Sequence, residues 1–263
     1  MTRQVPGFEP ATFTHQGRTH EVYRAGSGPA VVVVHELPGI HPGVVELGQR
    51  LVDAGYTVYL PSLFGRPGEP FAVGATLRSV LRVCVAREFT ILADRTSPVA
   101  TWLRALAAKA HGECGGPGVG AVGMCFTGGF ALAMAVEPAV LAPVVSQPSL
   151  PAPVNARKRA AVGLDDADLA AVKARTNHGL RILGLRFSDD RGCPAERFDR
   201  LRRELGEGFE AIETDSSPGN PYGIPKRAHA VLTIDLVDEP GHPTRAALDR
   251  IMAFLGERLR PPA

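Results

Sequence analysis

The chain has 263 residues, 44% of them hydrophobic and 21% charged, which is typical of a globular protein with a sizeable core and excludes a mainly disordered chain. Its formal net charge is +2, from 29 basic and 27 acidic residues spread along the chain, so we expect neither nucleic acid nor an anionic membrane as a partner. The N-terminal sequence lacks the apolar core of a secretory signal, and no apolar run reaches the roughly 18 residues of a membrane helix, so we expect a cytoplasmic protein.

The predicted elements alternate between strands and helices from residue 28 onward. The run GPAVVVVHEL at 28–37 is apolar on both faces, as in a strand buried inside a parallel sheet, and the helical spacing of 42–55 follows it. Further strands are predicted at 56–63, 119–124, 140–150, 181–190 and 209–217. Further helices are predicted at 77–92, 98–110, 125–135, 193–208 and 243–259.

One polar stretch, at 151–179, departs from this alternation and has helical spacing only at 168–175. The rest predicts a single α/β domain over residues 1–263, with a mostly parallel sheet covered by helices on both faces. About the first 15 residues are expected to be less ordered. In open α/β sheets ligands bind at the carboxyl ends of the strands, so the residues that follow each strand are the first candidates for chemistry.

The four cysteines, Cys84, Cys114, Cys125 and Cys193, are widely separated and form no C-x-x-C pair. In a chain long enough to fold without disulfides, we expect reduced thiols. Only Cys125 has unusual surroundings, because the sequence GMCFTG places it between a predicted strand and a predicted helix. This is the setting of a nucleophile elbow, where a tight turn projects the nucleophile over the sheet and aims backbone N–H groups at an oxyanion.

Two features weaken the elbow if it is taken alone. The G-x-S-x-G form would place a glycine at Thr127, whereas here the glycine is Gly128. A small buried cysteine at a strand end is the plainer alternative. The overlapping GVGAVG at 118–123 matches the dinucleotide pattern G-x-G-x-x-G, but the predicted strand lies within it instead of before it, so we interpret this match as chance.

A histidine and an acid follow Cys125 in the order expected of α/β hydrolases, which is nucleophile, acid, histidine. Asp190 ends a predicted strand, and His229 comes after the next one. Asp189 is an adjacent candidate acid, while His35 and His242 do not complete the order. Taken singly, Asp190 could belong to an ordinary polar turn before a helix, and His229 could merely start a helix. Three roles in the right order at strand ends are harder to obtain by chance.

The motifs HELPGI, GMCFTGG, DDRGCP and AHAVLT together resemble the dienelactone hydrolase family of α/β hydrolases, which use a cysteine in place of the usual serine. The resemblance covers most of the chain, from the valine strand to the last helix. The family's spacing between acid and proline implies that Asp190, four residues before Pro194, is the acid.

The resemblance also implies roles for residues near the first strand. Glu36 would interact with the thiol of Cys125 in the resting enzyme and help to form the thiolate, although a solvated charge at a strand end is the plainer alternative. The backbone N–H groups of Leu37 and Phe126 would form the oxyanion hole.

Members of the family hold a substrate carboxylate with arginines, one of them four residues after the histidine. That position is Thr233 in this chain, and the other arginine falls in a helical region where Arg82 and Arg87 are both candidates. The resemblance therefore favours the hydrolytic machinery over the diene lactone substrate itself.

From the residues and the resemblance we expect a cysteine-dependent hydrolase that cleaves a small-molecule ester or lactone through a thioester intermediate, with no cofactor and no metal. Two alternatives stay open at this point. One is a protein of the same fold that binds a small molecule without turnover, and the other is a nucleotide-binding protein that uses GVGAVG.

Overall fold

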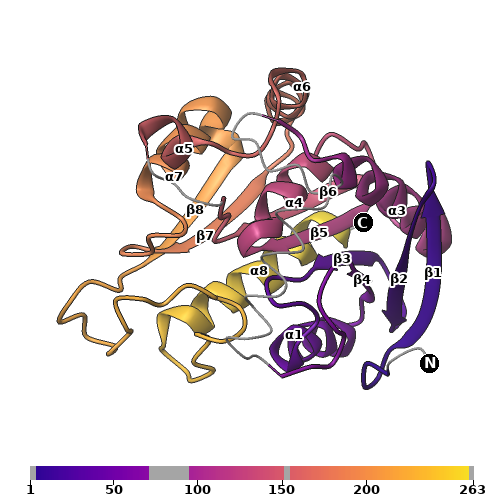
Figure 1. Ribbon diagram of the computed structural model, residues 1–263, viewed down its shortest axis with the longest axis horizontal. Helices are drawn as coiled ribbons and strands as arrows, with labels where there is room; N and C mark the ends of the chain where they lie inside the picture. The colour runs from indigo at the N-terminus through magenta and orange to yellow at the C-terminus, as the bar shows by residue number, and fades with distance from the viewer. Residues whose placement is uncertain (1–3, 71–94, 151–154, 261–263) are drawn as a thin grey trace.

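The computed structural model describes residues 4–70, 95–150 and 155–260, which form an eight-stranded sheet in the order β1-β2-β4-β3-β5-β6-β7-β8 (Figure 1). The strands are β1 Glu9–His15, β2 Arg18–Ala25, β3 Ala30–Val34, β4 Thr57–Ser62, β5 Val119–Met124, β6 Val140–Ser146, β7 Ile182–Phe187 and β8 Phe209–Thr214. The helices are α1 Pro42–Asp53, α3 Pro98–Cys114, α4 Gly128–Met134, α5 Ala156–Ala160, α6 Asp166–Asn177, α7 Ala195–Leu205 and α8 Pro243–Leu259. The expected mostly parallel sheet is confirmed, because the antiparallel pairings among the described strands are limited to β1 with β2 and β2 with β4.

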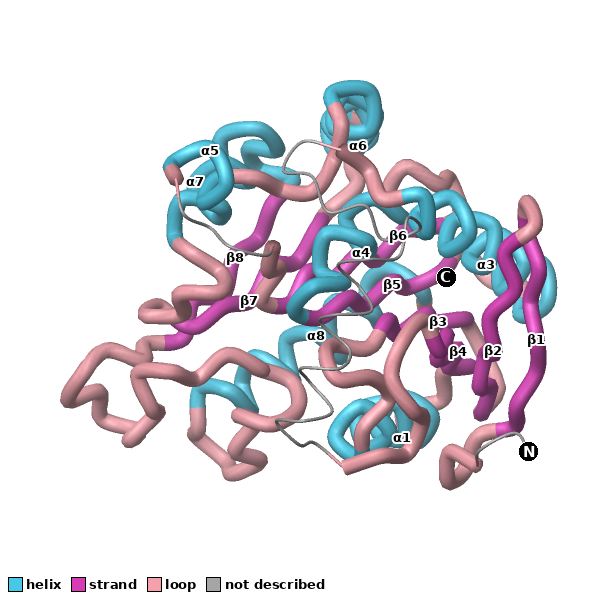
Figure 2. The backbone as a smooth tube through the Cα atoms, viewed as in Figure 1, coloured by secondary structure: helices cyan, strands magenta, loops and turns pink. Residues whose placement is uncertain are grey.

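Helices cover both faces of the sheet, as expected (Figure 2). The valine run of β3 explains how, since successive side chains of a strand point to opposite faces. Val31 and Val33 pack into a cluster with side chains of α1 and α8, whereas Val32 and Val34 pack with side chains of α3 and α4. All four valines are fully buried, so β3 is apolar on both faces because both faces are covered.

The predicted elements inside the described ranges are present, with shifted ends. The helix predicted at 98–110 continues to Cys114, and the polar stretch holds α5 as well as α6. Asp165 caps α6, because its side chain accepts a hydrogen bond from the Asp168 N–H at 2.9 Å. The helix predicted at 77–92 lies outside the described residues. Within those residues, no helix combines the length and apolar character that crossing a membrane requires.

The expectation of less order in about the first 15 residues is wrong for residues 9–15, which form β1. β1 pairs with β2 along its whole length, from Glu9 opposite Arg24 to His15 opposite Arg18. The connecting residues Gln16 and Gly17 both have positive φ, 47° and 74°, which is the backbone of a tight hairpin turn. Gln-Gly is a weaker turn signal than Asn-Gly or Asp-Gly, so the sequence pattern did not predict the hairpin.

The register of the parallel strands brings their carboxyl ends to one edge of the sheet. Val34 lies opposite Gly123, Met124 opposite Ser146, and Ser146 opposite Leu185. Side chains that follow these strands therefore meet at this edge, although they come from distant parts of the sequence. The residues that follow β3, β5, β6 and β7 there include Glu36, Cys125, Gln147 and Asp190.

Candidate active site

Cys125 occupies a strained turn between β5 and α4. Its φ is +55°, a left-handed backbone conformation that is uncommon for a residue with a side chain. Strained φ values of this kind concentrate at functional sites, where the surrounding structure holds them in place. Cys125 is partly exposed, and the one-turn 3-10 helix of residues 125–127 continues directly into α4. The turn thus presents the thiol above the sheet edge, as an elbow does.

The sequence around Cys125 fits this turn because two of its residues have no room for a larger side chain. A Cβ at Gly123 would lie 2.4 Å from the Thr127 carbonyl oxygen, and a Cβ at Gly128 would lie 2.8 Å from Cα of Pro148. The glycine therefore comes one residue later than in G-x-S-x-G because position 128 has no room for a side chain.

Thr127, which stands where the serine form of the motif has glycine, is fully buried and satisfies its hydroxyl within the turn. Its Oγ1 accepts a hydrogen bond from the Met124 N–H at 3.1 Å. The same hydroxyl donates toward the Val34 and Met124 carbonyl oxygens, which lie 2.8 and 3.0 Å away. Thr127 therefore ties the elbow to the end of β3, which the sequence pattern did not reveal.

His229 and Asp190 meet beside this elbow. The Nδ1 atom of His229 lies 2.7 Å from Oδ2 of Asp190, whose other oxygen accepts the Gly192 N–H at 2.8 Å. An ionised carboxylate only accepts hydrogen bonds, so Nδ1 is the donor and Nε2 is left for Cys125. Asp190 is 6% exposed, whereas Asp189 faces Lys226 at 3.9 Å. The structure thus brings Asp190, and not Asp189, against the imidazole.

The turn that carries His229 is fixed by a single carboxylate. Asp235 Oδ2 accepts hydrogen bonds from the backbone N–H groups of His229 and Ala230, both at 2.8 Å. The Asp235 N–H in turn donates to the Ala230 carbonyl oxygen at 3.0 Å. No strand forms at the apolar run that begins at His229, and this compact turn takes its place.

The electrostatic surroundings of His229 favour its protonated form. Burial by itself lowers the pKa of the imidazole, but the neighbouring Cys125 and the hydrogen-bonded Asp190 more than offset burial and hold that pKa well above its usual value of 6.5. A hydrogen bond between His229 and Cys125 contributes to the same shift. The arrangement therefore suits a proton that moves from sulfur to imidazole.

Glu36 lies at the same edge but has other partners. Its carboxylate is 2% exposed, and it accepts hydrogen bonds from His41 Nε2 and Gln147 Nε2, each at 3.2 Å, and from the Thr233 hydroxyl. Among the described residues it makes no hydrogen bond with Cys125. A solvated surface charge is therefore wrong for Glu36, which is a buried and well-partnered carboxylate.

The two residues next to Glu36 also have defined environments. His35 is fully buried, donates from Nδ1 to the Glu36 carbonyl oxygen at 3.0 Å and accepts the Leu63 N–H at Nε2 at 3.1 Å. Burial lowers the pKa of His35 to about 4, so this histidine stays neutral and structural at pH 7. The Leu37 N–H makes no hydrogen bond within the described part of the chain.

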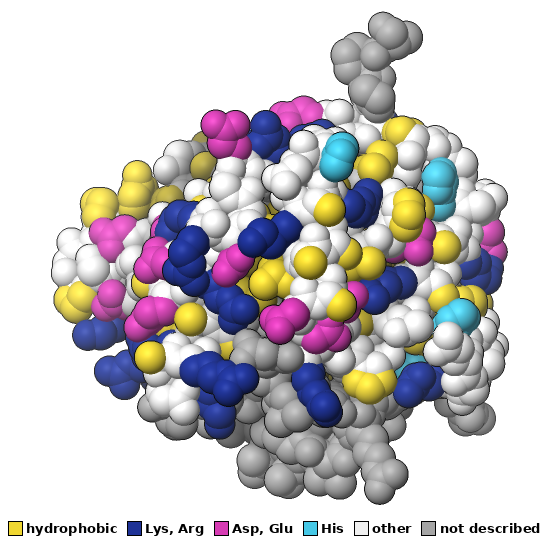
Figure 3. Space-filling view, turned by 90° about the horizontal axis from the view of Figure 1, so that it is seen from above, with side chains coloured by type: hydrophobic (Ala, Val, Ile, Leu, Met, Phe, Trp, Pro, Cys, Tyr) yellow, Lys and Arg dark blue, Asp and Glu magenta, His cyan; other side chains and the backbone are white. Residues whose placement is uncertain are grey.

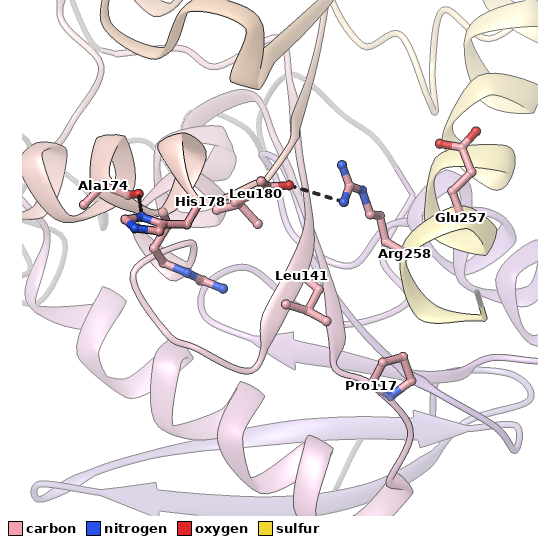
Figure 4. A pocket seen from close by; sticks show the side chains of 9 residues that line it. Pro117, Leu141, Ala174, His178, Leu180, Glu257 and Arg258 are labelled. Carbon is pink, nitrogen blue, oxygen red and sulfur yellow. Dashed lines mark hydrogen bonds between the residues drawn. The ribbon is translucent and has the colours of Figure 1, made fainter. Parts of the chain in front are cut away.

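One cavity of about 690 Å³ opens beside the candidate site. Its walls are formed by Asp189, Asp190, Arg191, Gly192, Pro225, Lys226, Arg227 and His229. A second cavity, of about 550 Å³, lies at the opposite, amino-terminal edge of the sheet between Pro117, Leu180 and Arg258, and contains none of the expected site residues (Figure 4). The face seen in Figure 3 mixes basic and acidic side chains. Arg82 and Arg87 lie outside the described residues.

The remaining cysteines differ from Cys125. Cys114 and Cys193 are free thiols, as expected, and Cys84 lies outside the described residues. Cys193 is fully buried, and burial raises the pKa of its thiol to about 12, which makes it unreactive. Gln147 and His41 are site residues that sequence reasoning missed. Gln147 directly follows β6 at the ligand-binding edge, and this position after a predicted strand could have identified it.

Comparison of the sequence with known proteins finds similarity to one protein family. The model of the dienelactone hydrolase family matches residues 18–163. A Salmonella typhi protein named "Putative carboxymethylenebutenolidase" is 36% identical over 88 residues, which are 33% of this chain and 32% of that protein. The match thus spans about a third of the length of the curated relative.

Solved structures share the fold across nearly the whole chain. The "Putative Dienelactone Hydrolase" of Klebsiella pneumoniae superposes with a TM-score of 0.65 at 18% identity, over 95% of this chain and 98% of that one. A dienelactone hydrolase of Anabaena variabilis superposes with a TM-score of 0.61 at 16% identity, over 96% of this chain and 98% of that one. At these identities the likeness shows the α/β-hydrolase fold alone.

Proposed function

This chain belongs to the dienelactone hydrolase family, and on that premise we propose that it hydrolyses a small-molecule ester or lactone through a thioester on Cys125. The observation that carries the proposal is the hydrogen bond between Cys125, which has φ +55°, and the His229 imidazole, whose Nδ1 is 2.7 Å from the buried Asp190 carboxylate. A structural cysteine needs neither the strained turn nor the oriented histidine.

In the proposed acylation step, Cys125 is the nucleophile and His229 the base. Nε2 of His229 takes the thiol proton, and Sγ attacks the carbonyl carbon while one electron pair moves to the carbonyl oxygen. The backbone N–H groups of Leu37 and Phe126 would stabilise that oxyanion. Asp190 orients the imidazole and stabilises its charge. When the oxyanion collapses, the C–O bond breaks and His229 returns the proton to the leaving oxygen, which gives a thioester and an alcohol.

Deacylation reverses these roles with water as the nucleophile. His229 takes a proton from water, the oxygen attacks the thioester carbonyl, and the C–S bond breaks. The sulfur recovers its proton from His229, and the carboxylic acid is released. For a lactone the alcohol and the acid are parts of one product. These steps need only groups of this chain and water.

The substrate is proposed only as an ester or lactone. The arginine that would hold a substrate carboxylate four residues after the histidine is replaced by Thr233, whose hydroxyl donates to Glu36. A dienelactone is therefore not the favoured substrate on the residues described, and simple activated esters are the appropriate first probes.

The first test is the turnover of p-nitrophenyl acetate by the parent chain and by Cys125→Ala. We expect the variant to lose measurable turnover, and His229→Ala to lose about 10²- to 10⁴-fold, the usual contribution of general acid–base catalysis. Cys114→Ala is the matched control, because it removes a free thiol at the end of α3 and should retain parental turnover. Turnover that persists in Cys125→Ala would remove the proposed nucleophile, and a parent that turns over no ester or lactone would favour a binding protein.

A further inference from the structure

Glu36 is surrounded by three donors that come from three different loops. His41 precedes α1, Gln147 follows β6, and Thr233 belongs to the turn that carries His229. Glu36, His41 and Gln147 are 2%, 2% and 0% exposed, so water does not compete for the hydrogen bonds that His41 and Gln147 donate to Glu36. A buried carboxylate requires such partners, because an unpartnered buried charge is strongly destabilising.

The hydrogen bonds of His41 fix its tautomer. Its Nδ1 accepts the Gly43 N–H at 3.2 Å, at the start of α1, so the proton of a neutral imidazole must be on Nε2. Nε2 then donates to Oε1 of Glu36 at 3.2 Å. His41 therefore donates to Glu36 from Nε2, and the start of α1 sets the orientation of its ring.

Gln147 reaches Glu36 from a strained backbone. Its φ is +32°, and its side chain is fully buried at the carboxyl end of β6. Nε2 donates to Oε2 of Glu36 at 3.2 Å, while Oε1 accepts the hydroxyl of Ser146. Both ends of the amide are thus used, which fixes its orientation. Strain at a buried residue persists only when the surroundings over-determine it.

Thr233 connects Glu36 to the turn of His229. Thr233 N–H donates to the Ala230 carbonyl oxygen at 3.3 Å within that turn, and its hydroxyl donates to Oε1 of Glu36. The packing around this contact is tight, because a Cβ at Gly43 would lie 3.2 Å from Cβ of Thr233 and 3.1 Å from the His41 ring. A shift of the Glu36 carboxylate would therefore displace both the His229 turn and the loop that carries Leu37.

We propose that Glu36 is a positioning residue, held by His41, Gln147 and Thr233. It keeps the Leu37 N–H and the His229 turn in place around Cys125. This inference rests on the proposed function and departs from the role that the family resemblance implies, in which Glu36 helps to form the Cys125 thiolate. With three side-chain donors already bound, the Glu36 carboxylate makes no hydrogen bond with Cys125 among the described residues, and His229 alone takes the thiol proton.

Two reactions of Cys125 separate these roles. Alkylation by iodoacetamide requires a thiolate but forms no tetrahedral oxyanion, whereas ester turnover requires both the thiolate and the oxyanion donors. If Glu36 acts by positioning, its loss slows turnover and spares alkylation. If Glu36 takes the thiol proton, its loss slows both reactions in parallel.

The experiment compares the parent with Glu36→Gln, Thr233→Val and Thr233→Ser, measuring kcat and KM for p-nitrophenyl acetate and the rate of Cys125 alkylation at pH 7. Thr233→Val keeps the shape of threonine but removes the donor, and Thr233→Ser restores it. We expect Glu36→Gln and Thr233→Val to lower kcat about tenfold or more, while KM and the alkylation rate stay within about threefold of the parent. Thr233→Ser should return kcat to near the parental value.

A reciprocal exchange adds a rescue test. Glu36→Gln alone brings a donor amide toward other donors, whereas Glu36→Gln with Gln147→Glu restores a donor–acceptor pair at the same place. Positioning predicts that the double variant recovers part of the lost kcat.

The results that would overturn the inference are specific. An alkylation rate that falls in parallel with kcat in Glu36→Gln would show that Glu36 accepts the thiol proton. A parental kcat in Thr233→Val would show that the hydrogen bond from Thr233 to Glu36 has no positioning role. If Glu36→Gln unfolds, as circular dichroism would reveal, the two Thr233 variants still decide the matter. Turnover that survives Cys125→Ala removes the proposed function itself, which distinguishes that failure from failure of this inference.

Discussion

His35 and Glu36 are neighbours in the sequence, yet their side chains hold different parts of the site. Glu36 binds three side-chain donors, whereas His35 ties the Glu36 carbonyl oxygen to the Leu63 N–H. This second bridge uses one nitrogen as donor and the other as acceptor, which only neutral imidazole can do. The loop that carries the proposed oxyanion donor Leu37 is thus held through a histidine that must remain uncharged.

We expect His35 to make folding sensitive to acid. Burial lowers its pKa from 6.5 to about 4 in the folded protein, so between those values the unfolded chain binds a proton that the folded chain does not. The free energy of unfolding is unaffected by the titration of His35 above pH 6.5. It falls by a total on the order of 3 kcal/mol as the pH decreases from 6.5 to about 4.

Urea unfolding of the parent and of His35→Gln at several pH values measures this effect. The free energy of unfolding of the parent should fall more steeply between pH 6.5 and 4 than that of the variant, whatever the difference between them at pH 7. Equal slopes for the two proteins would show that His35 does not titrate in this way.

At the scale of elements, the turn from β5 to α4 depends on close approach between backbone segments. Gly123 permits that approach, and buried Thr127 then fastens the turn to β3 through its hydroxyl. The glycine before the cysteine was a readable signal of the elbow. The threonine was not, because its role depends on the position of a neighbouring strand that is distant in sequence.

Substitution of Gly123 by alanine tests this account of the turn. The added Cβ would lie 2.4 Å from the Thr127 carbonyl oxygen and 2.8 Å from Cβ of Ala131, so we expect a loss of about 3 kcal/mol in the free energy of unfolding, together with loss of turnover. Gly112→Ala in α3 is the control, because its Cβ would meet nothing within 4 Å. That control should gain up to about 1 kcal/mol from helix propensity. Similar stability changes for the two variants would contradict the steric explanation.

At the scale of the whole molecule, the site is assembled from loops that buried side chains hold together. Arg197 of α7 is 1% exposed and donates to the Pro148 carbonyl oxygen at 2.6 Å and to the Gly192 carbonyl oxygen at 3.1 Å. Pro148 follows Gln147, and the Gly192 N–H binds Asp190. One buried guanidinium therefore links the loop after β6 to the loop of the candidate acid.

The sequence predicted those parts of the molecule that depend on local pattern. The valine run of β3, the order of strands and helices, and the place of Cys125 at a strand end all follow from periodicity and turn residues. The contacts of Glu36 could not be predicted, because His41, Gln147 and Thr233 converge only after the sheet has formed. The hairpin of β1 and β2 was missed because its Gln-Gly turn is a weak signal.

The most direct measurement is the mass of the protein during turnover. Rapid quenching of the parent with p-nitrophenyl acetate should give a protein heavier by one acetyl group, and peptide mapping should place that group on Cys125 and not on Cys114 or Cys193. Cys125→Ala should acquire no such group. An acetyl group found elsewhere, or parental turnover by a Cys125→Ala protein that never acquires one, would contradict a thioester on Cys125.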